Sequence, residues 1–496
     1  MSRFRRAKEN ATDLTTDLAP ALFGTLRDSD EEAGMRLTRH GLLLRRRGHA
    51  DRVVPHDELG TPRVERVTLV VPLTDGSAVE LDGEDTAAYA PWLAALGADG
   101  PAEPVPAAAP AVAASLGPLL LGRATRPALL VLEDGTAYGG TAFGADGESF
   151  GEAVFNTGMT GYQETLTDPS YHRQVVVMTA PHVGNTGTND VDPESGRVWV
   201  AGFVVRDPSP VASSWRARRS LDRELQDAGV VGLGGVDTRA ITRRLRDSGA
   251  MRCGVSSVES DPHALLARVL ASPVMTGADL AREVSTPEAY VVPAVGERRF
   301  RVAALDLGMK RSTPAYLAAH GCEVHVLPAT STADDLLAVD PDGVFFSNGP
   351  GDPAVTSYAV EAMSGVLGIR PVFGICLGNQ ILGRALGLGT FKLRFGHRGV
   401  NQPVQDLVTG RVAITSHNHG FAVSAPDDVR APMATPFGEV VVSHVDLNDG
   451  VVEGLRCLEV PAFSVQYHPE AAPGPHDAVG LFGEFAALMS GSVVSR

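Results

Sequence analysis

The stretch RPVFGICLGNQILGRALG, residues 370–387, joins a short apolar run to a glycine-flanked cysteine and then to a helical pattern. PVF predicts a buried strand, and the residues from Leu377 onward predict an amphipathic helix. Gly374-Ile375-Cys376-Leu377-Gly378 has the G-x-nucleophile-x-G form of a nucleophile elbow, with cysteine in the place of serine. A thiol at a helix N-terminus is favoured as the thiolate by the helix dipole. Taken alone, the pattern also fits a buried core cysteine, because short strings of this kind occur by chance.

The residues before this stretch alternate between predicted strands and helices. VAALDLG (302–308), CEVHVLPA (322–329) and DGVFF (342–346) predict strands, and KRSTPAYLAAHG (310–321) predicts a helix. Apolar strands without alternation, joined by helices, favour an open, mostly parallel sheet with helices on both faces. Ligands of such sheets bind beyond the carboxyl ends of the strands, which is where Cys376 falls.

Two further motifs also follow predicted strands. In SVQYHPE (464–470), His468 and Glu470 are two residues apart, so in an extended segment their side chains leave the same face. Glu470 can then orient the imidazole while its other nitrogen faces a thiol. A solvated turn would be the better interpretation of an isolated H-P-E. SNGPGDP (347–353) predicts a rigid loop whose backbone N–H groups suit an oxyanion or a carboxylate, although a structural turn fits equally well.

Composition limits the class of protein. A chain of 496 residues predicts about two to four domains, and a net charge of −16 argues against a nucleic-acid partner. The four cysteines lie far apart, without zinc spacings or a disulfide framework, which is typical of a reduced cytoplasmic protein. We find neither a secretory signal nor an apolar run long enough to span a membrane. The expectation is a cytoplasmic protein without a metal site; the cysteines are Cys253, Cys322, Cys376 and Cys457.

Four regions are predicted along the chain. Residues 1–96 show strand patterns with a hairpin signal at Asp75-Gly76 and a helix near 84–96, which predicts a β-rich domain similar in pattern to bacterial PH-like domains. Arg45–Arg47 could contact acidic lipid headgroups, but a solvated strand end is the more common explanation, so membrane contact is not expected. Residues 97–125 are an Ala/Pro-rich linker. Residues 126–285 predict a smaller α/β domain, and residues 300–491 the domain that carries Cys376.

SNGPGDP, GICLGNQ and YHPE, in this order, resemble the motifs of class I glutamine amidotransferases. Over residues 127–490 the chain is similar, more specifically, to the small subunits of glutamine-dependent carbamoyl phosphate synthetases. The segments that carry this resemblance are FNTGMTGYQE (155–164), DPSY (168–171), GNTG (184–187), DTR (237–239), FGHRG (395–399) and NHGFAV (418–423). Two features depart from the family: Asn379 stands where many relatives have histidine, and residues 1–120 have no counterpart.

The resemblance implies a role for each matching residue. Cys376 would be the nucleophile, His468 the base and then the acid, and Glu470 its orienter. The glutamine site would consist of Ser170, Gly349, Gly351, Leu377, Gln380, Asn418, Gly420 and Phe421.

The resemblance also implies a partner. Ammonia would pass to a large subunit that uses bicarbonate, ATP and Mg²⁺ to make carbamoyl phosphate for arginine and pyrimidine biosynthesis, and this chain itself would hold no cofactor. Two alternatives are an amidotransferase component for anthranilate or guanine nucleotide synthesis, and a lipid- or protein-binding adaptor with a vestigial amidase.

Overall fold

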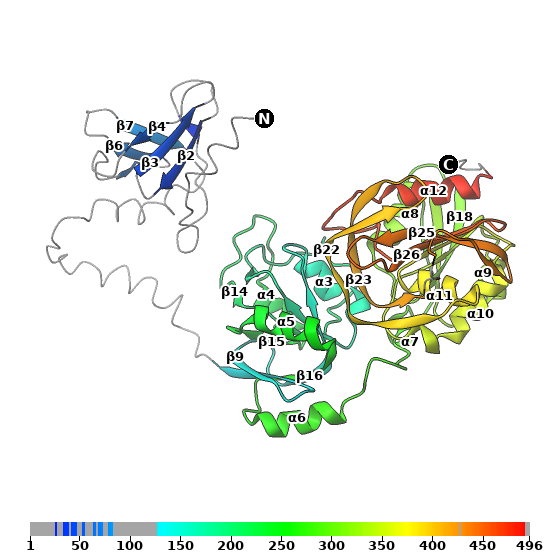
Figure 1. Cartoon of the computed structure of the whole chain (residues 1–496), viewed down its shortest axis with the longest axis horizontal. Helices are drawn as coiled ribbons and strands as arrows, with labels where there is room; N and C mark the ends of the chain where they lie inside the picture. The colour runs from blue at the N-terminus through cyan, green and yellow to red at the C-terminus, as the bar shows by residue number, and fades with distance from the viewer. Residues whose placement is uncertain are drawn as a thin grey trace. The chain divides into compact units, whose positions relative to one another are not determined.

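The protein is described here from a computed structural model, which covers residues 126–424, 426 and 428–491 together with the backbone of seven strands between residues 25 and 82 (Figure 1). The chain divides into two compact units, residues 1–122 and residues 123–496.

The first unit contains two antiparallel sheets. One has the strand order β1-β7-β6-β5 and the other β2-β3-β4, so the predicted β-rich character is confirmed. Strands β6 and β7 flank the Asp75-Gly76 hairpin signal. The predicted helix near 84–96, the linker at 97–125 and the side chains of Arg45–Arg47 lie outside the described residues. The strands are β1 (Thr25–Leu26), β2 (Ala33–Thr38), β3 (Gly41–Arg46), β4 (Arg52–Val54), β5 (Arg63–Glu65), β6 (Thr68–Pro72) and β7 (Ala78–Asp82).

The second unit begins with a closed barrel in the order β10-β11-β13-β15-β9-β8-β16. Its β8–β9 hairpin turns at the predicted Asp134-Gly135. The helices α4, α5 and α6 begin at capping side chains; Asp237, for example, accepts from the Ala240 N–H at the start of α5. The barrel strands are β8 (Pro127–Leu132), β9 (Ala137–Gly144), β10 (Glu148–Asn156), β11 (Gln174–Met178), β13 (Gly202–Val204), β15 (Val231–Gly234) and β16 (Met251–Ser256).

Short elements join the barrel strands and lead to the next domain. Strands β12 and β14, which come from the connections between barrel strands, form a separate two-stranded sheet. The 3₁₀ turn η4 follows shortly after α3. These elements are β12 (His182–Val183), β14 (Asp207–Pro208), α3 (Tyr162–Thr167), η4 (Pro169–Tyr171), α4 (Leu221–Asp227), α5 (Thr238–Ser248), α6 (Pro262–Ala271) and α7 (Ala281–Val284).

The C-terminal domain is built on an 11-stranded sheet in the order β17-β19-β18-β20-β21-β27-β26-β25-β22-β23, with β24 paired to β25. Strands β19, β18, β20, β21 and β27 are mutually parallel. The strands are β17 (Tyr290–Val292), β18 (Phe300–Asp306), β19 (Cys322–Pro328), β20 (Gly343–Phe346), β21 (Val372–Ile375), β22 (Thr390–Asp406), β23 (Val412–Val423), β24 (Met433–Thr435), β25 (Gly438–Asp446), β26 (Val452–Cys457) and β27 (Ala462–Val465).

The prediction of a mostly parallel sheet is right for the five central strands and wrong for the rest, so the sheet is mixed. Residues 390–457 form hairpins, and their strands pair antiparallel. Short turns connect these strands, whereas a parallel pair would need a crossover of a dozen or more residues.

Helices cover both faces of this sheet, as predicted. Leu336, Met363 and Ile381, from α9, α10 and α11, share one apolar core. Leu317 and Phe482, from α8 and α12, belong to a second core. No helix of the described residues is long and apolar enough to cross a membrane. The helices are α8 (Ser312–Ala319), α9 (Ala333–Ala338), α10 (Ser357–Val366), α11 (Leu377–Ala385) and α12 (Gly480–Met489), with the 3₁₀ turn η5 (Pro353–Val355).

Candidate active site

Cys376 lies in the sharp turn between β21 and α11. Its φ of 55° and ψ of −102° are rare for a residue with a side chain, a strain found at functional sites. Gly378 permits the turn, because a Cβ there would lie 2.3 Å from the Phe346 carbonyl oxygen. The Cys376 N–H donates to the Val465 carbonyl at 2.8 Å, which joins the elbow to β27. This is the geometry of a nucleophile elbow.

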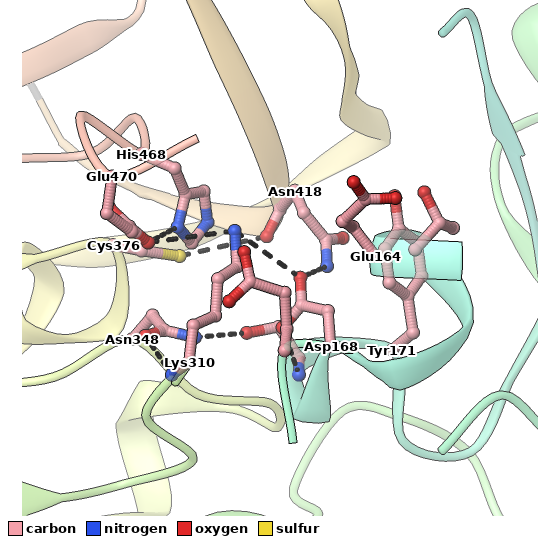
Figure 2. A network of polar contacts seen from close by, with 12 residues as sticks. Glu164, Asp168, Tyr171, Lys310, Asn348, Cys376, Asn418, His468 and Glu470 are labelled. Carbon is pink, nitrogen blue, oxygen red and sulfur yellow. Dashed lines mark hydrogen bonds and ion pairs between the residues drawn. The ribbon is translucent and has the colours of Figure 1, made fainter. Parts of the chain in front are cut away.

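His468 and Glu470 follow β27 and pair with each other. The His468 Nδ1 and the Glu470 Oε1 are 2.7 Å apart, and both side chains are fully buried. The pairing was predicted for an extended segment, but β27 ends at Val465, and a bend and turn bring the two side chains together. Figure 2 shows the Cys376 sulfur beside the His468 ring. The His468 Nε2 has no hydrogen-bond partner among the described residues, so it is available to exchange a proton with the thiol.

Lys310 adds a buried cation that the sequence reasoning missed. Its Nζ lies 3.6 Å from the Glu470 Oε1 and 3.8 Å from the Asp168 Oδ2 (Figure 2). A signal for it was present: Lys310 is one of three lysines in the chain and comes shortly after the carboxyl end of β18. Ligand sites in parallel sheets lie at such ends.

The ionisation states follow from these charges. Burial and the charge of Lys310 lower the pKa of His468, but Glu470 and Cys376 outweigh them and raise it to about 10. Burial favours a neutral Glu470, yet the charges of His468 and Lys310 lower its pKa to about 2. Burial acts against a charged Lys310, and its acidic neighbours, Asp168 first, raise its pKa above the ordinary value. At neutral pH His468 is therefore an imidazolium, which stabilises negative charge on the Cys376 sulfur.

The site crosses the boundary between the barrel and the C-terminal domain. The Asn348 Nδ2 donates to the Ser170 Oγ at 3.0 Å, and the Asn418 Nδ2 donates to the Asp168 Oδ2 at 3.0 Å. Asp168 also accepts from the Ser170 N–H at 2.9 Å, which fixes η4 against this boundary. The barrel thus supplies one wall of the space around the nucleophile.

A cavity lies in front of Cys376. All the predicted glutamine contacts except Leu377 line it, and Leu377 is the first residue of α11, next to Cys376 in the chain. His468 and Glu470 lie outside the lining. The predicted residues in the lining are Ser170, Gly349, Gly351, Gln380, Asn418, Gly420 and Phe421, and those not predicted are Glu152, Gln174, Met275, Pro350, Arg398 and His419.

The unpredicted lining carries both signs of charge. Glu152 is buried and forms an ion pair with Lys392. Arg398 is buried on β22, and its Nη1 donates to the Phe395 carbonyl at 2.8 Å. A carboxylate and a guanidinium in one cavity suit a small zwitterion, whose ammonium and carboxylate need opposite partners.

The SNGPGDP loop is held against the elbow. The Gly378 N–H donates to the Ser347 carbonyl at 3.1 Å, and the Ser347 hydroxyl accepts from the Leu307 N–H at 2.9 Å. A Cβ at Gly349 would lie 2.0 Å from the Leu307 carbonyl oxygen, so the close approach of these segments requires glycine. The loop therefore presents its backbone to the cavity in a fixed position.

Asn379, the residue of α11 that departs from the family pattern, is fully buried, and both ends of its side-chain amide have hydrogen-bond partners. Its Oδ1 accepts from the Ser464 hydroxyl at 2.8 Å, and its Nδ2 donates to the Gln466 Oε1 at 3.2 Å. The same Gln466 oxygen accepts from Gln380 Nε2 at 3.1 Å. Asn379 thus helps to position Gln380, which lines the cavity.

Comparisons with known proteins agree with this arrangement. Residues 130–255 match the family model for the CPSase domain of the carbamoyl-phosphate synthase small chain, and residues 303–488 match that for class I glutamine amidotransferases. The carbamoyl phosphate synthase small chain of Streptomyces avermitilis is 65% identical over 75% of this chain and 98% of its own length. Those of Mycobacterium tuberculosis and Bifidobacterium longum are 58% and 56% identical, over 98% and 94% of their lengths and 73% of this chain in each case. The chain belongs to the carbamoyl phosphate synthase small chain family.

Proposed function

We propose that this chain hydrolyses L-glutamine to glutamate and ammonia through a thioester on Cys376, as the glutaminase of a carbamoyl phosphate synthase. The observation that carries the proposal is the buried Cys376, His468 and Glu470 set, with Cys376 at the base of a cavity that two domains share.

In the first half-reaction the Cys376 thiolate attacks the side-chain amide carbon of glutamine. The oxyanion that forms is stabilised by backbone N–H groups, among them that of Leu377 at the start of α11. His468 gives its proton to the amide nitrogen, ammonia leaves and the γ-glutamyl thioester remains. Glu470 and Lys310 stay ionised and hold His468 in place.

In the second half-reaction water attacks the thioester carbon. His468, now neutral, takes a proton from the water as the C–O bond forms. The tetrahedral intermediate collapses, the C–S bond breaks and glutamate is released, which restores the thiolate and the imidazolium. The glutamine would be bound by the cavity residues predicted above, with Glu152 and Arg398 offering partners of opposite charge.

The ammonia would be consumed by a separate large subunit that makes carbamoyl phosphate from bicarbonate with ATP and Mg²⁺. This division of work is supported by family membership, since the relatives are named as small chains. We infer a cytoplasmic complex that serves arginine and pyrimidine biosynthesis, with no cofactor of the reaction held by this chain.

The test uses the complex with the large subunit and compares glutamine with ammonium chloride as nitrogen donors. Cys376→Ser should abolish glutamine-dependent synthesis and leave ammonia-dependent synthesis unchanged. Cys457→Ser, which alters a buried cysteine of β26 away from the cavity, is the matched control and should retain both activities. Glutamine-dependent synthesis by the Cys376→Ser complex would overturn the assignment of the nucleophile.

A further inference from the structure

Behind the cavity, three histidines and one glutamate converge at the antiparallel end of the sheet. His397 is on β22, His417 and His419 are on β23, and Glu453 is on β26. Their side chains are 8%, 0%, 1% and 0% exposed, so the cluster is buried. The proposed glutaminase chemistry uses none of these side chains.

The ligand atoms have the spacing of a metal centre. His397 Nδ1 and His419 Nε2 each lie 3.6 Å from the Glu453 Oε1, and His417 Nδ1 lies 3.7 Å from its Oε2. The two nitrogens of His417 and His419 are 3.2 Å apart, and all four residues offer atoms within 4.8 Å of one another. Tetrahedral zinc with bonds of about 2.0–2.1 Å requires ligand atoms about 3.3 Å apart. The four separations given above, 3.2 to 3.7 Å, are close to this value.

Hydrogen bonds on the outer side of two rings fix their tautomers. The His419 Nδ1 is 2.9 Å from the Phe421 carbonyl oxygen, which can only accept, so Nδ1 carries the hydrogen. The His397 Nε2 is 2.8 Å from the Asp449 carboxylate, which likewise accepts. In each neutral ring, the inward nitrogen then presents a lone pair. A histidine whose outer N–H donates to a carbonyl or a carboxylate is the usual arrangement of a metal ligand.

The tautomer of His417, the third ring, is also fixed by an outer hydrogen bond, in this case to a hydroxyl group. The Thr415 Oγ1 donates its hydrogen to the Gln402 carbonyl at 2.9 Å, so it accepts from the His417 Nε2, which lies 2.7 Å away. The His417 Nδ1 is therefore also a lone-pair donor facing Glu453. Three inward imidazole nitrogens and a carboxylate point at the same place.

This convergence leaves polar atoms unsatisfied. Among the described residues, His397 Nδ1 and both oxygens of Glu453 lack a hydrogen-bond partner. Asp446 Oδ2, 4.0 Å from the His397 Nδ1, is also without one. Buried polar groups without partners are costly and rare in native proteins. A proton on one ring would remove one of the repulsions between the inward lone pairs. A divalent cation would give all four residues a bonding partner.

We propose that His397, His417, His419 and Glu453 bind a first-row divalent transition-metal ion, with zinc the best match to three imidazoles and one carboxylate. Four protein ligands in a buried site leave no open position, so the ion is structural. It joins β22, β23 and β26, and thereby fixes the strand that carries Asn418 to the cavity. Sequence patterns do not predict this site, because the ligands are dispersed and show none of the usual zinc spacings.

The test measures metal content in the full chain carrying Cys376→Ser, so that zinc bound at the glutaminase thiolate does not contribute. The protein is stripped with a chelator, loaded with Zn²⁺ or Co²⁺, separated from free metal and measured by inductively coupled plasma mass spectrometry. We expect one ion per chain, and visible Co²⁺ bands of a tetrahedral site without a thiolate charge-transfer band. His417→Gln and Glu453→Gln should lose the ion. His325→Gln, a partly buried histidine on β19 that pairs with Glu323, should retain it.

Asp449→Asn provides a variant with little effect on folding, because Asp449 is 42% exposed and an asparagine can keep the hydrogen bond that its Oδ1 accepts from the Val451 N–H. Loss of this partner should weaken zinc binding by about 10- to 100-fold. Parent protein that holds no ion after loading, or His417→Gln and Glu453→Gln variants that still hold one, would overturn the proposal and leave a proton at the centre. Because metal content is read without turnover, the result does not depend on the proposed glutaminase activity.

Discussion

The Nζ of Lys310 and the carboxylate of Glu470 are 3.6 Å apart, and both side chains are buried. The oxygen that Lys310 approaches, Oε1, is the one that pairs with His468 Nδ1 at 2.7 Å. One carboxylate oxygen therefore meets two cations. This contact holds Glu470 ionised and limits its rotation, so the residue that orients the imidazole is itself oriented.

Replacing Lys310 should damage both stability and activity. Lys310→Met keeps the length of the side chain but leaves Asp168 and Glu470 without their shared buried cation, which should cost about 3–5 kcal/mol in the free energy of unfolding. Urea denaturation measures this loss. Arg298→Met is the control: it removes an exposed ion pair with Glu323 and should cost about 0–1 kcal/mol. Equal losses in the two variants would contradict a shared buried cation.

Substitution at the domain boundary should affect binding more than chemistry. Ser170→Ala removes the hydroxyl that accepts from Asn348 and lines the cavity, a change of about 0.5–1.5 kcal/mol. The KM for glutamine should therefore rise by about 2- to 10-fold, with kcat nearly unchanged. Ser209→Ala, also in the barrel domain, removes a hydroxyl that donates to the Val211 carbonyl, and its KM should stay at the parent value. An unchanged KM in Ser170→Ala would exclude a glutamine contact.

The protonation of His468 should set the upper pH limit of glutamine hydrolysis. Because the pKa of His468 is raised to about 10, the imidazolium persists through neutral pH and is lost as the pH rises through that value. The imidazolium gives its proton to the leaving amide nitrogen, so kcat for glutamate release should stay nearly constant through neutral pH and fall as the pH approaches about 10. A decline of kcat near the ordinary histidine pKa of about 6.5 would contradict the raised pKa of His468.

Removal of the first unit should leave glutamine hydrolysis intact. Residues 1–122 form their own compact unit, and both family matches begin after residue 129. A chain that begins at residue 123 should therefore retain the glutaminase kcat and KM of the full chain, measured as glutamate release. A folded truncation with strongly reduced turnover would show that the first unit belongs to the enzyme.

The local parts of the site were predictable, because each is a short segment with its own geometry. The elbow around Cys376 and the pairing of His468 with Glu470 depend on residues at most a few positions apart. The contacts that join the two domains could not be predicted in this way, because Asn348 and Ser170 are 178 residues apart, and Asn418 and Asp168 are 250 residues apart. Periodicity describes which face of an element is apolar, but it does not determine which polar residues meet across two domains.

The same reason explains the two larger differences between expectation and structure. Residues 390–457 were not resolved into strands by their pattern, so the antiparallel part of the sheet was missed. Lys310 stood out only as a rare residue, and its importance comes from Asp168, Glu194 and Glu470, which approach it in the folded chain. Composition identified the residue, and only tertiary structure supplied its partners.

Alternation along β23 has a consequence for how the chain can vary. The imidazoles of His417 and His419 face the histidine cluster, whereas the Asn418 side chain between them donates to Asp168. A slip of β23 by one residue would exchange these faces, placing an amide in the cluster and an imidazole at the substrate. An insertion or deletion within β23 would therefore disrupt the histidine cluster and the contact between Asn418 and Asp168 together. Changes of length must fall in the turns on either side.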